Sequence, residues 1–430
     1  MDILQDSLSR ITQAATICNA PPWLIDELNS PKKIIPLKFR AVTHRGKESF
    51  EAVRVHQTNP YPTGGPHPYK GGWRYMRYPN RENMVITARA LANDMTLKIA
   101  GCGLPFGGAK GILNIDPGEY SDDEQEAITK ELVLEMLCAN ILDPDIDVPG
   151  PDYGTSAKTM KWMYIQYGRI NQLLHRPYPA AVVTGKPIDF NGCPGREDAT
   201  ARGGLIVYHE LVKKKNIPRI AVQGFGNVGY HICKLITNEH KGRLVAVCDE
   251  ANGIYNPKGI PFQELATYYY EHQTFKGCVL GDIITPEEII SAGRYDLFVT
   301  AAKEGLINKN TASKLRTSVL LELGNSAVTK EADEILEQEK ITVIPDIAAN
   351  PGGVIVSSFE WRLNRGDIYH KVDLDDLEHW VQEELSKILK FCIREILATQ
   401  EEFNTNLRMA AYIVALRRLE LLLKQKHGYK

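Results

Sequence analysis

The sequence is poor in cysteine and has no long apolar run. Eight cysteines in 430 residues are scattered from Cys18 to Cys392 without a Cys-x-x-Cys pair, which argues against a disulfide scaffold, a zinc ribbon or any bound metal. No apolar run reaches the roughly 18 residues that span a bilayer. The N-terminus, Met1-Asp2, lacks the basic and apolar regions of a signal peptide. We therefore expect a soluble, cytoplasmic protein with no membrane partner.

Charge of one sign is also missing. Lys plus Arg number 51 and Asp plus Glu number 53, so the formal net charge is −2. This balance gives no electrostatic case for binding nucleic acid. A hydrophobic fraction of 43% with 24% charged residues is typical of globular proteins. A chain of 430 residues is long enough for two or three domains with sizeable cores.

The first part of the chain mixes helical and extended patterns. Residues 34–55 predict a β-hairpin around Arg45-Gly46-Lys47. The segments 59–72 and 101–111 are rich in glycine and are expected to form loops. Apolar periodicity predicts helices over residues 3–17, 83–100 and 122–142. Pro21-Pro22 is expected to stop the first of them.

Beyond a glycine-rich and proline-rich junction at 186–203, short apolar runs alternate with helical patterns. Such runs predict a parallel sheet covered on both faces. One helical segment opens with the capping box Thr285-Pro286-Glu287-Glu288. The predicted strands are 220–223, 244–248, 297–300, 319–323 and 341–344.

The first of these strands runs into a dinucleotide-binding pattern, Gly224-Phe225-Gly226-Asn227-Val228-Gly229, and a helical pattern follows it. Glycines there permit a tight turn and close backbone approach to a pyrophosphate at a helix N-terminus. Asp249 ends the next strand, 20 residues beyond Gly229, with Glu250 after it. A carboxylate at this place bonds the ribose hydroxyls and repels a 2′-phosphate, so NAD is favoured over NADP. The alternative is that the glycines serve only a tight turn.

Three lysines lie near glycine-rich segments of the first part: Lys70, Lys98 and Lys110. If they converge on one cleft, they favour an anionic substrate and depress one another's pKa. A lysine with a depressed pKa can act as a general acid or base near neutral pH. The alternative is that Lys98 caps its helix and the other two are solvated.

Ordered motifs then link the two halves. The chain resembles the glutamate/leucine/phenylalanine/valine dehydrogenase family, and most closely its glutamate dehydrogenases. The resemblance covers roughly residues 35–365. The matching stretches are 65–74, 95–111, 147–154, 184–187, 195–204, 224–229 and 345–354.

The resemblance implies a fold of two α/β domains around a cleft. Residues 1–190 would form the substrate and oligomerisation domain, and residues 191–400 a Rossmann-like, doubly wound dinucleotide-binding domain. The C-terminal helix, 401–430, would pack back on the first domain. The family's habit implies a homohexamer.

For the chemistry, the resemblance makes Lys110 the catalytic lysine, which polarises the substrate carbonyl or activates water. Asp152 matches the aspartate that relays protons to and from the amino group. One group would stabilise oxyanion charge while the other moves protons. The alternative for Asp152 is a turn residue in Pro-Asp-Tyr-Gly.

For the substrate, Lys98 resembles the ligand of the α-carboxylate, and Asn350 would line the same pocket. Lys70 resembles the lysine that pairs with a side-chain carboxylate, assisted by the hydroxyl of Ser357, although Ser358 is the adjacent alternative. A buried lysine facing an apolar side chain would cost several kcal/mol. The implied substrate is therefore dicarboxylic.

For the coenzyme, Thr200 resembles the threonine that bonds the nicotinamide amide, and Asn325 the asparagine near the nicotinamide ribose. The alternatives are a helix N-cap for Thr200 and a simple turn for Asn325. Departures from the family pattern gather near the implied cleft. They are Trp73, Met76, Arg77, Ala201, Ser326-Ala327-Val328 and Pro351.

The expected activity is the reversible oxidative deamination of L-glutamate to 2-oxoglutarate and ammonium, with hydride transfer to NAD(P). Two alternatives stay open: an amino-acid dehydrogenase of other side-chain specificity, and a non-catalytic dinucleotide-binding protein of the same fold.

Overall fold

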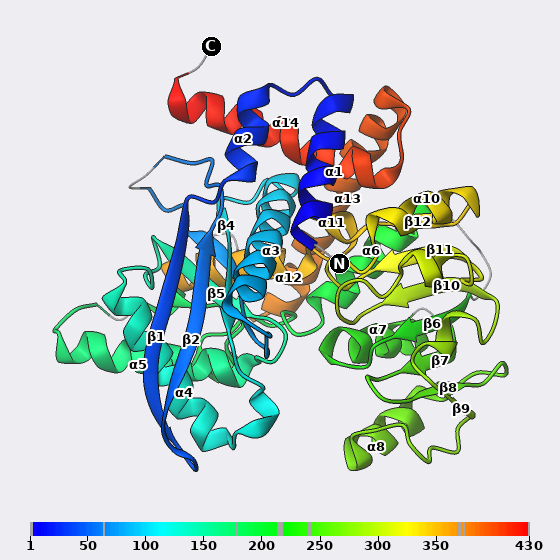
Figure 1. Cartoon of the computed structure of the whole chain (residues 1–430), viewed down its shortest axis with the longest axis horizontal. Coiled ribbons are helices and arrows are strands. Elements are labelled where there is room, and N and C mark those ends of the chain that lie inside the picture. Colours follow the sequence, from blue (N-terminus) through cyan, green and yellow to red (C-terminus); the bar gives the residue numbers. More distant parts are fainter. Residues whose placement is uncertain are drawn as a thin grey trace. The chain divides into compact units, whose positions relative to one another are not determined.

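The computed structural model describes residues 3–62, 65–177, 179–212, 218–239, 242–368, 372 and 375–428. The chain forms two compact units, named here by their sheets (Figure 1). The five-strand unit contains the residues up to Arg196 together with 354–384 and 412–430, and the seven-strand unit contains 197–353 and 385–411. This division differs from the expected one, because residues 354–384 group with the first unit and not with the second.

The sheet of the five-strand unit has the order β1-β2-β4-β3-β5. β1 and β2 form the predicted hairpin, and β3 runs parallel to both β4 and β5. The strands are β1 (Lys33–Thr43), β2 (Gly46–His56), β3 (Tyr69–Tyr75), β4 (Gly107–Leu113) and β5 (Asp147–Pro151). The helices are α1 (Ile3–Ile17), α2 (Pro22–Asn29), α3 (Arg81–Gly101), α4 (Asp122–Cys138) and α5 (Ala157–Leu173), with short 3-10 turns at Pro117–Glu119, Ala180–Val182 and Ile188–Phe190.

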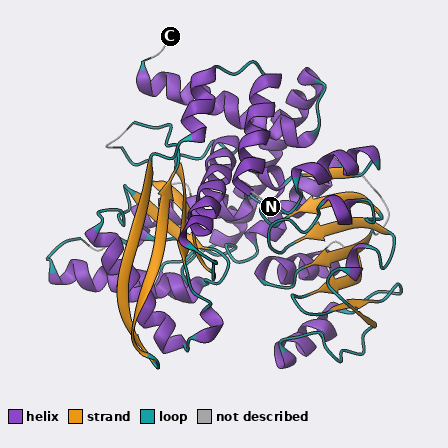
Figure 2. Cartoon of the chain, viewed as in Figure 1, coloured by secondary structure: helices purple, strands orange, loops and turns teal. Residues whose placement is uncertain are grey.

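Helices cover both faces of this sheet (Figure 2). On one face, Phe39, Phe50 and Trp73 pack with residues of α4 and α5. On the other face, Val53 and Val55 pack with α3. Alternate residues of β2 thus serve opposite cores, as the period of two in a strand requires.

Two helix boundaries of this unit differ from the sequence predictions. Pro21-Pro22 was predicted only to stop the first helix, but Pro22 also begins a second helix, α2. Proline is favourable at a first helical position, because the N–H that it lacks would have no partner within the helix. The helix predicted to reach residue 142 ends at Cys138. Asn140 then takes a left-handed conformation (φ 52°), which asparagine tolerates better than most residues.

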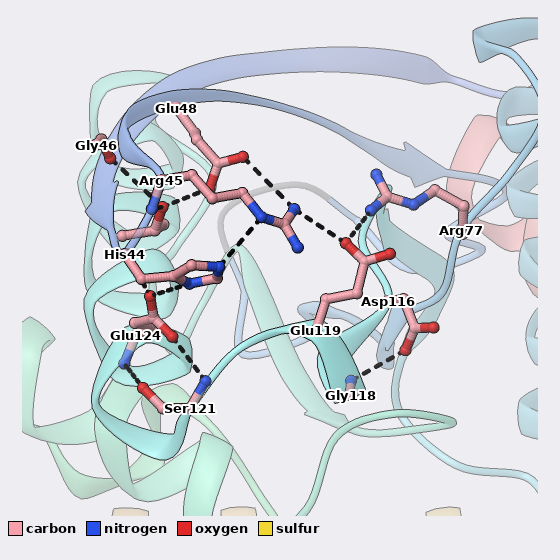
Figure 3. A network of polar contacts seen from close by, with 11 residues as sticks. His44, Arg45, Gly46, Glu48, Arg77, Asp116, Gly118, Glu119, Ser121 and Glu124 are labelled. Atoms are coloured by element: carbon pink, nitrogen blue, oxygen red, sulfur yellow. Dashed lines mark hydrogen bonds and ion pairs between the residues drawn. The ribbon is translucent and has the colours of Figure 1, made fainter.

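Polar side chains tie the hairpin turn to the start of α4 (Figure 3). Glu124 completes the capping box of α4 with Ser121, and its Oε1 also accepts from the backbone N–H of His44 at 2.5 Å. Oε2 of Glu119 forms ion pairs with Nη1 of Arg45 at 3.2 Å and with Nη2 of Arg77 at 2.8 Å. Arg77, one of the departures from the family pattern, therefore has an ion-pair partner at the surface.

The sheet of the seven-strand unit has the order β12-β11-β10-β6-β7-β8-β9. The five predicted strands are confirmed as a parallel set, and two short antiparallel strands, which the sequence did not reveal, extend it at one edge. The strands are β6 (Arg219–Gln223), β7 (Arg243–Cys248), β8 (Gly253–Tyr255), β9 (Asp282–Ile284), β10 (Tyr295–Thr300), β11 (Thr317–Glu322) and β12 (Thr342–Ile344).

Helices follow several strands of this sheet, as in a doubly wound fold. The capping box at 285–288 is present, since Thr285 and Glu288 bond each other's backbone N–H, but it opens only a 3-10 turn, Glu288–Ile290. The helices are α6 (Ala199–Leu211), α7 (Asn227–Asn238), α8 (Phe262–His272), α9 (Lys309–Ala312), α10 (Lys330–Gln338) and α11 (Asp346–Ala349).

Three last helices have residues in both units: α12 (Gly352–Arg365), α13 (Leu377–Phe403) and α14 (Leu407–His427). From residue 412 onward α14 groups with the five-strand unit, where Arg418 donates to the carbonyl of Ala100 at 3.2 Å. Of the expected C-terminal helix, residues 429–430 lie outside the described part of the chain. Among the described residues, no helix has the length and apolarity of a membrane span.

Candidate active site

The glycine-rich segments that carry Lys70 and Lys110 are strands, so the prediction of loops at these positions was wrong. Both lysines lie on adjacent parallel strands, β3 and β4. A Cβ on Gly71 would lie 1.6 Å from the carbonyl oxygen of Ala109. The glycine is therefore needed for the close approach of two strands, and not for a turn.

All three candidate lysines are buried. The exposed fractions are 3% for Lys70, 4% for Lys98 and 2% for Lys110. The alternative in which the lysines are solvated is therefore excluded. The charge of Lys98, in the last turn of α3, lowers the pKa of Lys110, so at least these two lysines share one electrostatic environment.

Lys110 forms an ion pair with the predicted aspartate. Its Nζ lies 2.5 Å from Oδ2 of Asp152, whose other oxygen accepts from Nε of Arg74 at 2.9 Å. The backbone N–H of Asp152 donates to the hydroxyl of Thr155 at 2.7 Å, and that hydroxyl donates to the carbonyl of Trp73 at 2.8 Å. Asp152 is thus held from both sides on the end of β5.

The protonation states follow from these contacts. Burial lowers the pKa of Lys110, Asp152 opposes this, and Arg74 and Lys98 lower the pKa further. For Asp152, burial alone would raise the pKa, but Lys110 and Arg74 outweigh it and hold the pKa well below its usual range. The lowered pKa of Lys110 suits proton transfer near neutral pH. The depressed pKa of Asp152 instead keeps this carboxylate ionised while Lys110 and Arg74 face it.

Unlike Lys110, Lys70 lacks a partner: no described residue forms a hydrogen bond or ion pair with its ammonium. Burial and the charge of Arg196 lower its pKa to about 7, although Glu360 opposes the shift. A Cβ on Gly150 would lie 3.2 Å from Nζ of Lys70 and 3.3 Å from the hydroxyl of Thr184. The bare Gly150 therefore leaves room next to a buried, unpaired cation.

Arg196 places a second positive charge near Lys70, and sequence reasoning missed it. Its Nε donates to the hydroxyl of Ser357 at 2.9 Å. Ser358 instead donates to the carbonyl of Ile355 in its own helix, which favours Ser357 of the two candidates. Arg196 stands inside the matching stretch 195–204, so its place in that motif was the available signal.

A buried ion pair behind β3 was also missed. Arg54 on β2 bonds both oxygens of Asp147, at 2.8 and 2.5 Å, and donates to the carbonyls of Gly71 and Gly72 at 3.1 Å each. His56 contacts the same carboxylate at 2.7 Å. The available signal was the charged Arg54 within an otherwise apolar strand segment. Arg54 fixes the backbone that carries Lys70 and Arg74.

The seven-strand unit carries the candidate dinucleotide site. Gly224 has a φ of +105°, which favours glycine, and a Cβ on Gly229 would lie 1.9 Å from the Gly224 carbonyl oxygen. A Cβ on Gly226, the N-cap of α7, would meet nothing within 4 Å. The turn at Gly226 is thus open in front of the free N–H groups of α7, and these residues fit a bound pyrophosphate.

Other predicted coenzyme residues lie in this unit. Asp249 follows β7, and its carboxylate accepts from the backbone N–H groups of Ala251, Asn252 and Phe275 at 2.7, 2.6 and 3.2 Å. Thr200 lies in the first turn of α6, whose N-cap is Asp198, so its alternative role as the cap is excluded.

Asn325 and Asn350 contact each other, with Asn350 Nδ2 3.0 Å from Asn325 Oδ1. Asn325 lies in a turn, which matches its alternative role without excluding the other. That Asn350 lines the substrate pocket stays a prediction. Among the described residues, no group of His, Cys, Asp and Glu side chains is arranged to hold a metal ion.

One departure from the family pattern has a structural explanation in its own unit. Trp73 lies over Gly111, where a Cβ would come within 2.5 Å of the indole, and the guanidinium of Arg54 lies 5.5 Å from the ring centroid. Ser326 takes a left-handed conformation, with a φ of +47°, which favours glycine over serine. Nothing in the structure explains Ser326, Met76 or Pro351.

The doubly wound unit with its glycine-rich turn is the fold of a dinucleotide-binding oxidoreductase, and the comparisons with known proteins agree with this class. A model of the family "Glutamate/Leucine/Phenylalanine/Valine dehydrogenase" matches residues 192–426, and a model of its dimerisation domain matches residues 31–169. The chain belongs to this family, and it is an NAD(P)-dependent amino-acid dehydrogenase.

Individual glutamate dehydrogenases support the assignment to this family. A glutamate dehydrogenase of Thermotoga maritima is 35% identical over 429 residues, 98% of each chain. The hetero-hexameric glutamate dehydrogenase of Thermus thermophilus, solved in a leucine-bound form, superposes with a TM-score of 0.89 at 26% identity, covering 100% of this chain and 98% of that one. The glutamate dehydrogenase of Peptoniphilus asaccharolyticus gives a TM-score of 0.79 at 28% identity, with 100% of both chains covered.

Proposed function

We propose that this chain catalyses the reversible oxidative deamination of L-glutamate to 2-oxoglutarate and ammonium. The observation that carries the proposal is the buried Lys70 ammonium, which lies near Arg196 and has no hydrogen-bond or ion-pair partner among the described residues. A buried cation without a counter-charge is costly, and a substrate carboxylate would supply the missing charge. An apolar side chain at the same place would leave Lys70 unpaired.

In this proposal the five-strand unit provides the proton chemistry. Lys98 binds the α-carboxylate, and Lys70 with Ser357 and Arg196 binds the side-chain carboxylate. Lys110 polarises the carbonyl or activates the water that attacks the imine, and Asp152 moves protons to and from the nitrogen. Such groups, fixed before the reaction, stabilise developing charge without reorganisation.

The seven-strand unit provides the coenzyme site. Gly224, Gly226, Asn227, Val228 and Gly229 would cradle the pyrophosphate at the N-terminus of α7. The nicotinamide ring of NAD(P)⁺, when bound, supplies the hydride acceptor. Thr200 would bond the nicotinamide amide, Asn325 would lie near its ribose, and Asn350 would reach the amino acid.

We also propose that NAD is preferred over NADP. Asp249 ends β7, and its negative charge would repel a 2′-phosphate. Three backbone N–H groups already occupy three of its roughly four acceptor positions, which leaves one for a ribose hydroxyl, so a contact with both hydroxyls is not favoured. Comparing KM for NAD⁺ and NADP⁺ at saturating glutamate tests this preference.

For the assembly we propose a homohexamer. The match to a dimerisation domain supports an oligomer, and the hetero-hexameric Thermus enzyme supports six subunits without bearing on whether they are identical. Sedimentation of the purified chain would show six copies of one mass, and a dimer or monomer would contradict the proposal. A cytoplasmic location stays a prediction.

The test of the reaction follows reduced-nicotinamide absorbance with glutamate, leucine, phenylalanine and aspartate, each with NAD⁺ and NADP⁺. We expect turnover of glutamate alone, and its loss in Lys110→Ala. Turnover of an apolar amino acid would contradict the role of Lys70. Absence of any turnover, in protein that NADH still stabilises thermally, would favour the non-catalytic alternative.

A further inference from the structure

A second cluster of buried charges lies in the seven-strand unit, around Arg408 in the first turn of α14. Arg408 is 3% exposed. Its guanidinium pairs with Glu322 at the end of β11, and with Asp333 of α10 at 2.8 Å. A third carboxylate, Asp346 at the start of α11, lies 3.7 Å from Nη1. One cation thus joins three separate elements.

This cluster is not arranged for stability alone. Among the described residues, Oε2 of the fully buried Glu322 has no hydrogen-bond partner, and neither has Nη1 of Arg408. Buried charges that are incompletely satisfied cost free energy, and apolar side chains of similar volume often serve stability better. A role in holding a particular geometry explains why such a cluster would be kept.

Asp346 connects the cluster to a strained turn. Its Oδ2 accepts from the backbone N–H of Ser326 at 2.9 Å, and its Oδ1 accepts from the N–H of Ile347 at 2.8 Å. Ser326 has a φ of +47°, a conformation that costs a non-glycine residue about 1–2 kcal/mol. The carboxylate of Asp346 therefore holds the chain in a shape that Ser326 does not prefer.

The strained turn carries the two amides implied in binding. Asn325 precedes Ser326, and its Oδ1 accepts from Nδ2 of Asn350 at 3.0 Å. The same nitrogen donates to the carbonyl of Leu323 at 3.1 Å, directly after Glu322. A displacement of Asp346 would thus reach both amides through short covalent and hydrogen-bonded paths.

We propose that Arg408 and Asp346 are positioning residues that hold the Asn325–Asn350 amide pair in the geometry that binds the coenzyme and the amino acid. This inference rests on the proposed function, which gives the two asparagines their roles. Neither positioning residue touches a reactant in it. Both act by fixing the turn at Ser326.

The chain offers a matched control. Asp346→Asn removes a charge from Arg408 and replaces one of the two accepting oxygens with an amide nitrogen, which cannot accept a backbone bond. Asp333→Asn also removes a charge from Arg408, which it contacts at 2.8 Å, but Asp333 lies on α10 and not in the turn. Arg408→Lys keeps the charge and loses the fork that reaches several carboxylates.

We would measure the Kd of NADH by fluorescence titration and the KM and kcat of glutamate, on protein whose thermal midpoint lies well above the assay temperature. In Asp346→Asn we expect Kd and KM to rise about tenfold, since small displacements of binding groups have effects of this order or larger. Arg408→Lys should show a smaller rise in the same constants. Asp333→Asn should stay within about twofold of the parent chain.

The outcomes separate the two proposals. If the parent chain turns over glutamate and Asp346→Asn keeps its Kd and KM while only its thermal midpoint falls, the cluster is merely structural and the inference is overturned. Equal losses in both asparagine variants would also overturn it. If the parent chain does not use glutamate, the proposed function fails, and the NADH titration still tests positioning. If Asp346→Asn does not fold, Arg408→Lys decides by the same constants.

Discussion

Two buried lysines on neighbouring strands differ in one respect, which is the presence of a partner. Lys110 on β4 has a carboxylate 2.5 Å away, whereas Lys70 on β3 has none among the described residues. Both are buried by about the same amount, and burial lowers the pKa of both. This difference supports the proposed roles, in which Lys110 has its proton partner within the chain and Lys70 pairs with a charge that the substrate brings.

A third lysine in the same unit shows what a structural pair looks like. Lys186 is fully buried, 2.7 Å from Glu360, and also donates to the carbonyl of Val183. Glu360 in turn accepts from the backbone N–H of Gly185. The contacts of this pair thus hold neighbouring parts of the fold together. Lys70 lacks such support, and this contrast separates a binding cation from a structural one.

The largest effect is expected at the paired lysine of the active site. Lys110→Met removes the group that activates carbonyl or water, and kcat for glutamate should fall by about 10²–10⁴-fold, as for other positioned acids and bases. KM should change much less, because other residues bind the carboxylates. Initial rates from reduced-nicotinamide absorbance measure both constants. A kcat within tenfold of the parent value would remove Lys110 from the mechanism.

The unpaired lysine should show a different combination of effects. In Lys70→Met, kcat/KM for glutamate should fall by about 10²–10³-fold, since the substrate carboxylate then lies buried without its cation. The free energy of unfolding at neutral pH should rise by about 1–3 kcal/mol, because an unpaired buried charge is replaced by an apolar side chain. Urea unfolding measures this second quantity.

Lys186→Met is the matched control for that measurement. It leaves Glu360 buried without its ammonium, and the free energy of unfolding should fall by about 3–5 kcal/mol. The same substitution at two buried lysines is thus expected to change stability in opposite directions. A loss of stability in both variants would show that Lys70 has a partner after all.

The comparison also shows what could be predicted from the sequence. The strands of the seven-strand unit were predictable because they are continuous apolar runs, and their parallel order was predicted with them. β3 and β4 were not predictable, because their glycines hide the strand pattern. Close neighbours in the folded chain explain these glycines, such as Ala109 at Gly71 and Trp73 at Gly111. The identities of Lys70, Lys110 and Asp152 came from motifs. Their partners, such as Arg74, depend on strand register, which no single segment of sequence contains.

The buried Glu322 allows the effect of burial on protonation to be tested on an acid as well as on the lysines. Burial raises the pKa of Glu322 to about 7; Arg408 opposes this, and Asp346 and Asp333 reinforce it. The native state therefore binds more protons than the unfolded chain between the ordinary pKa of about 4.5 and pH 7, so this group's contribution to stability is lost as the pH rises through that window. In Glu322→Gln this loss of stability should be absent. Urea unfolding of both proteins between pH 4.5 and 7 measures the free energy of unfolding against pH. If the two proteins show the same pH dependence, the raised pKa of Glu322 is contradicted.

The smallest effect on stability is expected at Glu124, whose carboxylate lies at the surface. Glu124 accepts from the backbone N–H groups of His44 and Ser121, and these bonds lower its pKa to about 2. The carboxylate therefore stabilises the hairpin turn above the ordinary pKa of about 4.5, and this contribution is lost as the pH falls from there toward 2. Glu124→Gln should lower the urea midpoint slightly near pH 7, with a smaller difference in high salt and at acid pH, because solvent and ions screen the contact. A large, salt-independent loss would mean that the turn depends on Glu124 as strongly as the buried sites depend on their charges.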